Sequence, residues 1–130
     1  MSKYLLDTSV LIWTLLSSSD ALSGRALEIL KGKGVERFVS AVSLWEIAIK
    51  YSIGKLPMDL TPKAFSEELL QSGEITCLDV TFRHAVSVAD LPFHHKDPFD
   101  RLLIAQAQCE GLPILTPDAN FKKYDVEVVW

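Results

Sequence analysis

The sequence has little cysteine, no long apolar run and no excess of positive charge. The two cysteines, Cys77 and Cys109, lie in apolar contexts without the spacing of metal ligands, so we expect buried thiols in a reducing compartment. No run of about 18 or more apolar residues occurs, and no charged leader precedes an apolar segment. Neither export nor a membrane span is therefore indicated, and a cytoplasmic protein is expected.

The net charge of −4 limits how the chain can bind a polyanion. Nucleic-acid-binding proteins usually carry a basic excess, so this one must place its Lys and Arg side chains locally or bind weakly. An acidic excess instead permits a cation site. With 130 residues, 48% of them hydrophobic and 23% charged, the chain is long enough for one domain with a real core. No repeat, linker or low-complexity segment divides it, so a single domain over residues 1–130 is expected.

Short apolar runs alternate with helical segments along the whole chain. Strands are predicted at residues 3–7, 37–42, 74–80, 113–116 and 126–129. Helices are predicted at residues 10–16, 23–30, 43–53, 64–71, 81–91 and 98–110, with a short one near 117–121. This alternation is typical of an α/β fold whose parallel strands are joined by right-handed helical crossovers.

A polar loop turns into an apolar helix at the segment that follows His94 and His95. Pro98 suits the first helical position, because its fixed φ is helical and its missing N–H is not needed there. Asp97 is then a natural N-cap, and Asp100 falls at the third helical position. Two carboxylates thus lie at the positive end of one helix. Capping alone can explain Asp97, so the interpretation depends on whether other acids reach the same place.

Three further acids follow predicted strands. Asp7 ends the first strand, Glu46 lies one helical turn beyond the second, and Asp118 comes just after the fourth. Ligands of open α/β sheets bind beyond the carboxyl ends of the strands, so these acids are expected at one edge. Asp100 joins them only if its helix packs with its N-terminus toward that edge, which the sequence alone does not require.

Each of the three acids also has a capping explanation. Asp7 could cap the first helix, Asp118 could cap the short helix, and Glu46 could complete the capping box that Ser43 begins. Neighbouring hydroxyls could cap these helices without any charge, and they belong to Ser9, Ser43 and Thr116. The capping explanation is therefore weaker for the four acids together than for each alone.

Four carboxylates within a few ångströms repel one another and raise their own pKa values. A hard divalent cation makes such a cluster stable, and Mg²⁺ or Mn²⁺ prefers an all-oxygen environment. A carboxylate-bound Mg²⁺ with open water positions suits phosphodiester hydrolysis, because it lowers the pKa of a bound water and offsets charge at the phosphate. One ion or two would be consistent with four acids.

Four segments carry a family resemblance: Leu5-Leu6-Asp7-Thr8-Ser9, Ser43-x-x-Glu46, Asp97-Pro98-Phe99-Asp100-Arg101-Leu102-Leu103-Ile104-Ala105-Gln106-Ala107, and Leu115-Thr116-x-Asp118-x-x-Phe121. Together they resemble a PIN domain, and in particular the VapC-type ribonuclease toxins of type II toxin–antitoxin modules. The resemblance covers almost the whole chain, in the family's order. The segment from Asp97 to Arg101 is its most specific part.

The resemblance implies a Mg²⁺-dependent endoribonuclease, with Mn²⁺ as a substitute, on an α/β/α sandwich with a small, mostly parallel central sheet. Asp7 and Asp100 match the core metal ligands. Glu46 and Asp118 match the remaining acids, which bind metal directly or through water, or orient the attacking water. Asp97 matches an extra acid of this subgroup. Hydroxyl positions beside the site match Thr8 or Ser9, and Thr116.

The resemblance also implies an RNA substrate, a homodimer and a small antitoxin protein that occupies a groove beside the site. Two apolar helical surfaces fit such partners or, alternatively, simple core packing. One carries Trp13 and Leu16, and the other carries Trp45, Ile49 and Ile53.

Basic side chains near the acids could steer an RNA backbone, which would make binding sensitive to salt. The candidates are Lys50, Lys55, Lys96, Arg101, Lys122 and Lys123. Arg101 is the strongest of them, although it could equally pair with Glu46 or Asp97. For His94 and His95 we favour an RNA contact or a plain loop role over catalysis, because the acid cluster needs neither a nitrogen ligand nor a further base.

Two other classes of function are possible. A phosphatase could use Asp7 as a nucleophile, but the haloacid-dehalogenase type needs a second Asp two residues later, where Ser9 stands. A non-enzymatic module could bind RNA or a protein, but a binder of polyanions gains nothing from four carboxylates.

Overall fold

A parallel sheet forms the centre of the protein. The computed structural model describes residues 2–130, and its strands are β1 (Ser2–Leu6), β2 (Val35–Ser40), β3 (Ile75–Leu78), β4 (Ile114–Leu115) and β5 (Val128–Val129). The strands lie in the order β3-β2-β1-β4-β5, and every neighbouring pair is parallel. The predicted parallel α/β sheet is confirmed.

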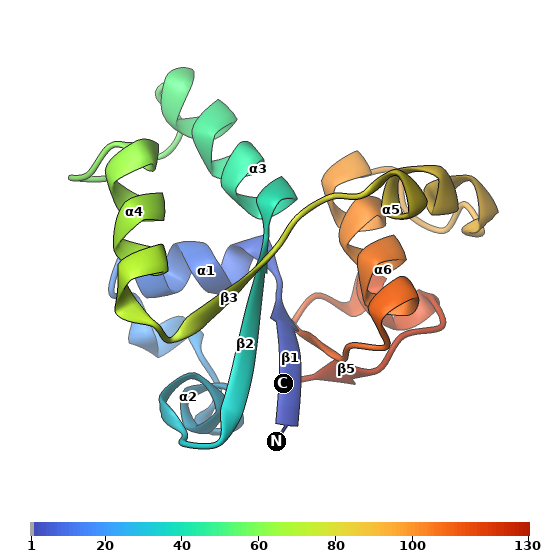
Figure 1. The fold of residues 1–130 in the computed structure, drawn as a ribbon, viewed down its shortest axis with the longest axis horizontal. Helices are drawn as coiled ribbons and strands as arrows, with labels where there is room; N and C mark the ends of the chain where they lie inside the picture. Colours follow the sequence, from blue (N-terminus) through green and yellow to red (C-terminus); the bar gives the residue numbers. More distant parts are fainter. Residues whose placement is uncertain (1) are drawn as a thin grey trace.

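Helices cover both faces of this sheet. They are α1 (Thr8–Leu15), α2 (Gly24–Lys31), α3 (Ala41–Ser52), α4 (Pro62–Ser72), α5 (Phe82–Ser87) and α6 (Pro98–Glu110), with 3₁₀ turns η1 (Ser19–Ala21), η2 (Val88–Asp90) and η3 (Ala119–Lys123). Figure 1 shows α1, α2 and α4 to one side of the strands and α5 and α6 to the other. The fold is therefore an α/β/α sandwich, as the resemblance implied.

Alternate residues of the central strands build the two halves of the core. Leu5 of β1 and Ile114 of β4 pack in the cluster that α6 covers, whereas Leu6 and Leu115 pack in the cluster of α1, α2 and α4. Successive side chains of a strand point to opposite faces, so a strand buried on both sides must be apolar throughout. This explains why the strands read as continuous apolar runs in the sequence.

The strand order places a switch point between β1 and β4. The chain leaves β1 toward β2 on one side and later adds β4 on the other, with Leu6 opposite Leu115. Connections diverge at such a point and leave a crevice outside the carboxyl ends of the two strands. In Figure 1, β1 and β2 run upward to this edge, and α6 begins there beside α3 before it runs back down the sheet. The residues just after β1 and β4 consequently meet at the crevice.

The start of α3 differs from the prediction. β2 ends at Ser40, and the Ser40 hydroxyl caps α3 by accepting the backbone N–H of Val42 at 3.1 Å. The same hydroxyl donates to Gln106 of α6 at 2.6 Å. Ser43 instead lies inside the helix, so the predicted capping box of Ser43 and Glu46 is wrong. Ser40 and Ser43 are both possible helix caps in the local sequence. The hydrogen bond to the buried Gln106 of α6 favours Ser40 as the cap.

The cysteine prediction is also wrong for one residue. Both thiols are free, but Cys77 is exposed because it lies on β3, which is an edge strand of the sheet. Cys109 is half-buried on α6, with its sulfur 3.5 Å from the hydroxyl of Ser87.

Over residues 2–130, the helices are all too short or too polar to cross a bilayer.

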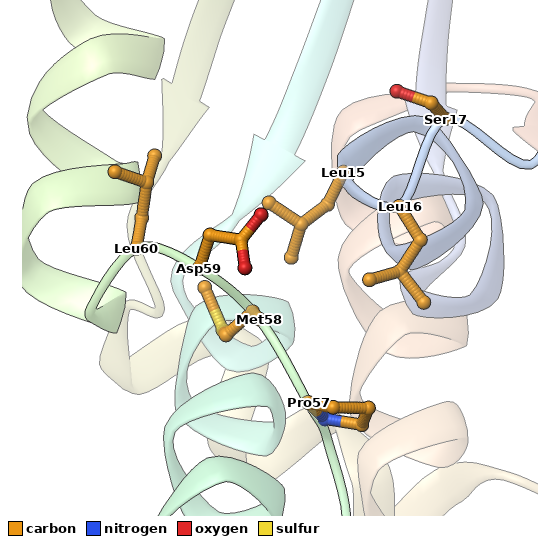
Figure 2. A pocket seen from close by; sticks show the side chains of 7 residues that line it. All are labelled: Leu15, Leu16, Ser17, Pro57, Met58, Asp59 and Leu60. Atoms are coloured by element: carbon orange, nitrogen blue, oxygen red, sulfur yellow. The ribbon is translucent and has the colours of Figure 1, made fainter.

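The apolar helix α1 divides into a buried and an open part. Val10 and Leu11 are buried in the core, so core packing explains this part of the apolar helix. The end of the helix borders a hollow of about 290 Å³. Figure 2 shows Leu15 and Leu16 facing the segment from Pro57 to Leu60 across this hollow. The surface at the end of α1 is therefore left partly uncovered by the rest of the described chain.

Candidate active site

Asp7 lies at the carboxyl end of β1 and is 4% exposed. Its Oδ2 accepts two hydrogen bonds, from the hydroxyl of Ser9 at 2.9 Å and from that of Thr116 at 2.7 Å. Asp7 occupies the N-cap position of α1, but its side chain makes no capping hydrogen bond. The capping explanation for Asp7 is thus wrong, and two hydroxyls hold the carboxylate in place.

Asp97 begins α6 as predicted. Its Oδ1 accepts the backbone N–H groups of Phe99 at 2.8 Å and of Asp100 at 3.2 Å, and Pro98 occupies the first helical turn. At the other end of α6, Gly111 adopts φ 67°, a left-handed conformation that glycine reaches without strain. The cap leaves the Asp100 side chain free of any capping role.

Asp100 is surrounded by like charge. The pKa of Asp100 is raised to about 7, mainly by burial and in smaller part by the negative charges of Asp7 and Asp97, while a hydrogen bond from His95 opposes the rise. The pKa of Asp7 is also raised, mainly by burial and in small part by the charge of Asp118. These interactions show that α6 brings Asp100 to the same edge as Asp7, which the sequence argument had to assume.

Asp118 combines a capping role with a place at this edge. Its Oδ1 accepts the backbone N–H of Asn120 at 2.9 Å and so caps η3. Its own backbone N–H donates to the hydroxyl of Thr116 at 3.1 Å, and that hydroxyl donates in turn to Asp7. Thr116, which is fully buried, therefore connects the two acids.

Glu46 has a different environment from the other acids. It is not among the charges that raise the pKa of Asp7 or Asp100. Its Oε2 pairs with Lys50 at 3.0 Å, whereas its Oε1 is buried without a partner in the described part of the chain. Such an oxygen calls for a ligand from outside the chain, either water or a cation. Nearby, Trp45 packs edge-on against Phe99 of α6 with ring centroids 5.2 Å apart, so this turn of α3 borders the start of α6.

The donor set at this edge fits a hard divalent cation. Asp7, Asp100 and Asp118 supply carboxylate oxygens, and the buried Oε1 of Glu46 lies on the neighbouring helix. Oxygen ligands of this kind suit Mg²⁺ and Mn²⁺. Within residues 2–130, one group of three side chains has its ligand atoms all within 4.8 Å of one another, and it consists of His95, Asp97 and Asp100, so it shares only Asp100 with this donor set.

Arg101 is not available to RNA, contrary to the sequence-based expectation. Its buried guanidinium donates to the carbonyls of Pro92 at 3.0 Å and Val88 at 3.3 Å and to the hydroxyl of Tyr124 at 3.2 Å, and it lies 4.4 Å from the ring centroid of Phe93. The alternative, a pairing with Glu46 or Asp97, is wrong as well, because the guanidinium has these other partners. Arg101 instead holds the loop that precedes α6.

The remaining candidates occupy varied environments. Thr8 does not touch an acid through its hydroxyl, which lies 2.8 Å from that of Ser43 and joins α1 to α3. Lys50 is engaged by Glu46. Lys96 and Lys122 are exposed, and their contact with RNA stays a prediction.

Sequence reasoning underrated His95 and missed Tyr124. The Nε2 of His95 lies 2.9 Å from Oδ2 of Asp100, and the backbone N–H of His95 donates to the Tyr124 hydroxyl at 2.9 Å. Tyr124 is buried at the end of η3, far from His95 in sequence. His95 lies five residues before Asp100, in the loop that leads into α6. This short separation was the signal in the sequence that could have indicated their contact.

The raised pKa values predict how stability responds to pH when metal is absent. Between the usual Asp value of 3.8 and about 7, the folded chain retains a proton on Asp100 that the unfolded chain has released. Stability must therefore fall as pH rises through this window. We expect melting in EDTA to show a lower Tm at about pH 8 than at about pH 5. Added Mg²⁺ should raise Tm more at the higher pH, since it binds the ionised carboxylates.

Asp125→Asn is the control for this pH series, because Asp125 is exposed and its loss should leave the slope unchanged. Asp100→Asn should flatten the slope. A Tm that increases with pH across the window in EDTA would contradict the proposed repulsion among these acids.

The fold and the site define an α/β protein with an acidic centre at the switch point of a parallel sheet. The PIN domain family profile matches residues 4–127. The chain belongs to the PIN domain family. No curated protein matches it.

Solved structures with the same fold include three toxin–antitoxin assemblies. VapBC2 from Rickettsia felis, bound to a DNA fragment from its promoter, has 15% identity and a TM-score of 0.70, over 98% of this chain and 97% of that one. DNA-bound VapBC from Salmonella typhimurium has 18% identity and a TM-score of 0.66, over 99% and 98%. A toxin-antitoxin complex from Klebsiella pneumoniae has 16% identity and a TM-score of 0.63, over 98% and 96%.

Proposed function

We propose that this protein is a metal-dependent endoribonuclease that acts in the cytoplasm as the toxin of a toxin–antitoxin pair. What supports the proposal is the position of Asp7 at the switch point of the sheet, with Asp100 and Asp118 each near enough to Asp7 for like charge to contribute to the raised pKa values of Asp7 and Asp100. Like charges so placed are stable when a divalent cation neutralises them.

In this proposal Asp7, Asp100 and Asp118 hold Mg²⁺ or Mn²⁺, and Glu46 contributes its unpartnered oxygen directly or through water. When bound, the ion lowers the pKa of a coordinated water and offsets charge on the phosphate. The chain's own part is to hold the ligands in place. Ser9 and Thr116 hold the carboxylate of Asp7, and the cap at Asp97 holds the start of the helix that carries Asp100.

RNA binding in this proposal relies on the exposed amines near the site, because the chain as a whole is acidic. Lys96 adjoins Asp97 in the loop before α6, and Lys122 lies on η3 after Asp118. A phosphate between these amines and the ion would have positive charge on two sides. Contacts of this kind make binding weaken as salt concentration rises.

The toxin assignment rests on the PIN family membership together with the toxin–antitoxin assemblies among the structures of the same fold. We propose a small antitoxin as the partner and a homodimer as the assembled form. The apolar side chains that remain exposed, including Leu16, Trp45 and Ile53, support a need for protein partners.

A phosphatase that uses Asp7 as nucleophile is less well supported. Asp7 is nearly fully buried, and one of its oxygens already accepts two hydroxyl protons. A nucleophilic carboxylate must reach its phosphorus atom, and this arrangement restrains that movement.

The test is cleavage of total RNA by the purified chain, with mapping of the cleavage sites. We expect cleavage with Mg²⁺ or Mn²⁺ and a loss of about 100-fold or more in EDTA, since the ion activates the water and stabilises the phosphate. Excess Mg²⁺ should restore it. Cleavage that persists in EDTA would refute the metal-dependent proposal, and RNA binding without turnover in every divalent ion would favour a binding module.

A further inference from the structure

His95 is attached to the site at two points. Its backbone N–H donates to the hydroxyl of Tyr124 at 2.9 Å, and its ring Nε2 lies 2.9 Å from Oδ2 of Asp100. The ring is mostly covered, with 23% of the side chain exposed. A surface histidine that only met solvent or RNA would need neither attachment.

The loop that carries His95 is supported along its length. Arg101 donates to the carbonyl of Pro92 at the start of the loop, and it also donates to the hydroxyl of Tyr124 that His95 uses. Asp97 ends the loop by capping α6. Arg101, Tyr124 and the cap therefore define where the imidazole of His95 stands relative to Asp100.

The contact has a specific chemical consequence for Asp100. An imidazole N–H that donates to Oδ2 restricts rotation of the carboxylate. Oδ1 is then the oxygen that remains free to bind the ion. Carboxylates that bind metal are commonly held by such partners, and loss of the partner typically weakens metal binding by about 10–100-fold. A hard cation prefers oxygen ligands, so the carboxylates of the site are better suited to bind it than the nitrogen of His95.

We propose that His95 is a positioning residue, whose ring N–H holds Oδ2 of Asp100 and thereby orients the carboxylate that binds the divalent ion. This inference rests on the proposed function of the acidic centre as a metal site. It assigns His95 a role through Asp100 and not through RNA.

The test is the affinity for Mn²⁺, measured by electron paramagnetic resonance of the free ion during titration. His95→Leu should weaken Mn²⁺ binding by about 10–100-fold, because the donor is lost. His95→Gln should stay within about threefold of the wild type, because its amide N–H can donate to the same oxygen. His94→Phe is the matched control, because His94 is exposed in the same loop and an aromatic ring there keeps the packing against Tyr124, with ring centroids 5.3 Å apart. Its Mn²⁺ affinity should be unchanged.

Two further measurements separate positioning from the other roles. At saturating Mn²⁺, the KM for RNA should be the same in His95→Leu and the wild type. The bound Mn²⁺ should show no hyperfine coupling to a histidine nitrogen. Unchanged Mn²⁺ affinity in His95→Leu, an effect confined to the KM for RNA, or a clear nitrogen coupling would each overturn the positioning role. Thermal melts of all three variants verify that they are folded.

The outcomes distinguish this inference from the proposed function. A wild-type chain that binds Mn²⁺ in a His95-dependent manner but cleaves no RNA would refute the nuclease and support the positioning role. A chain that cleaves RNA with metal but binds Mn²⁺ equally well in His95→Leu would support the nuclease and refute the positioning role. Absence of Mn²⁺ binding by the wild type would overturn both.

Discussion

Asp100→Asn is expected to slow metal-dependent RNA cleavage by about 100-fold or more while the chain stays folded. The amide removes one negative ligand from the acidic centre and presents a donor in place of an acceptor. Folding should not suffer, because Asp97 provides the cap of α6 and Asp100 contributes no capping bond. Loss of the buried charge should even raise Tm in EDTA at neutral pH, since burial and like charge raise the pKa of Asp100 to about 7.

Single-turnover cleavage and thermal melts of the same preparations measure these two effects. Asp125→Asn serves as the control for activity, because Asp125 is exposed and lies outside the acidic centre. A variant with lower Tm and undiminished cleavage would show that Asp100 serves the helix and not the chemistry.

Arg101→Met is expected to lower the free energy of unfolding by about 3 kcal/mol, because several buried acceptors lose their donor. The guanidinium serves the carbonyls of Pro92 and Val88 and the hydroxyl of Tyr124, and Met can replace only its apolar stem. For a chain of this size the corresponding decrease in Tm is about 10 °C. Urea denaturation followed by circular dichroism measures the change.

Arg83→Met is the matched control for this measurement. Arg83 is exposed on α5, and its replacement should change stability by no more than about 0.5 kcal/mol. If Arg101 contacted RNA, its replacement would raise the KM for RNA and leave the urea midpoint unchanged, and that result would contradict the structural role assigned to it here.

Local signals in the sequence were reliable where a single stretch of chain decides the outcome. Pro98 and Asp97 begin α6 as predicted, because a fixed φ and a side-chain acceptor act within one turn. The apolar runs became strands of the sheet for a similar reason. The start of α3 was predicted wrongly, because Ser40 and Ser43 are equivalent as local caps and the choice depends on Gln106, which is distant in sequence.

The acids were predicted to be neighbours, but their individual environments were not. Arg101 looked like a surface residue beside an acid, yet the packing of the loop at Pro92 and Tyr124 buries it. Glu46 was grouped with the other acids by its distance from a strand end, yet its second oxygen pairs with Lys50. Distance along the chain does not specify the direction of a side chain on a helix that packs against several elements.

The amino-acid sequence by itself determined the alternation of strands and helices, the apolar strands and the presence of acids just beyond them, since periodicity, caps and turns act over a few residues. Only the tertiary structure decided that β4 lies beside β1, so that Thr116 reaches Asp7, and that the loop before α6 folds back so that His95 reaches Asp100. Those contacts join residues that the sequence separates or leaves in an irregular loop, and they depend on strand order and side-chain packing throughout the domain.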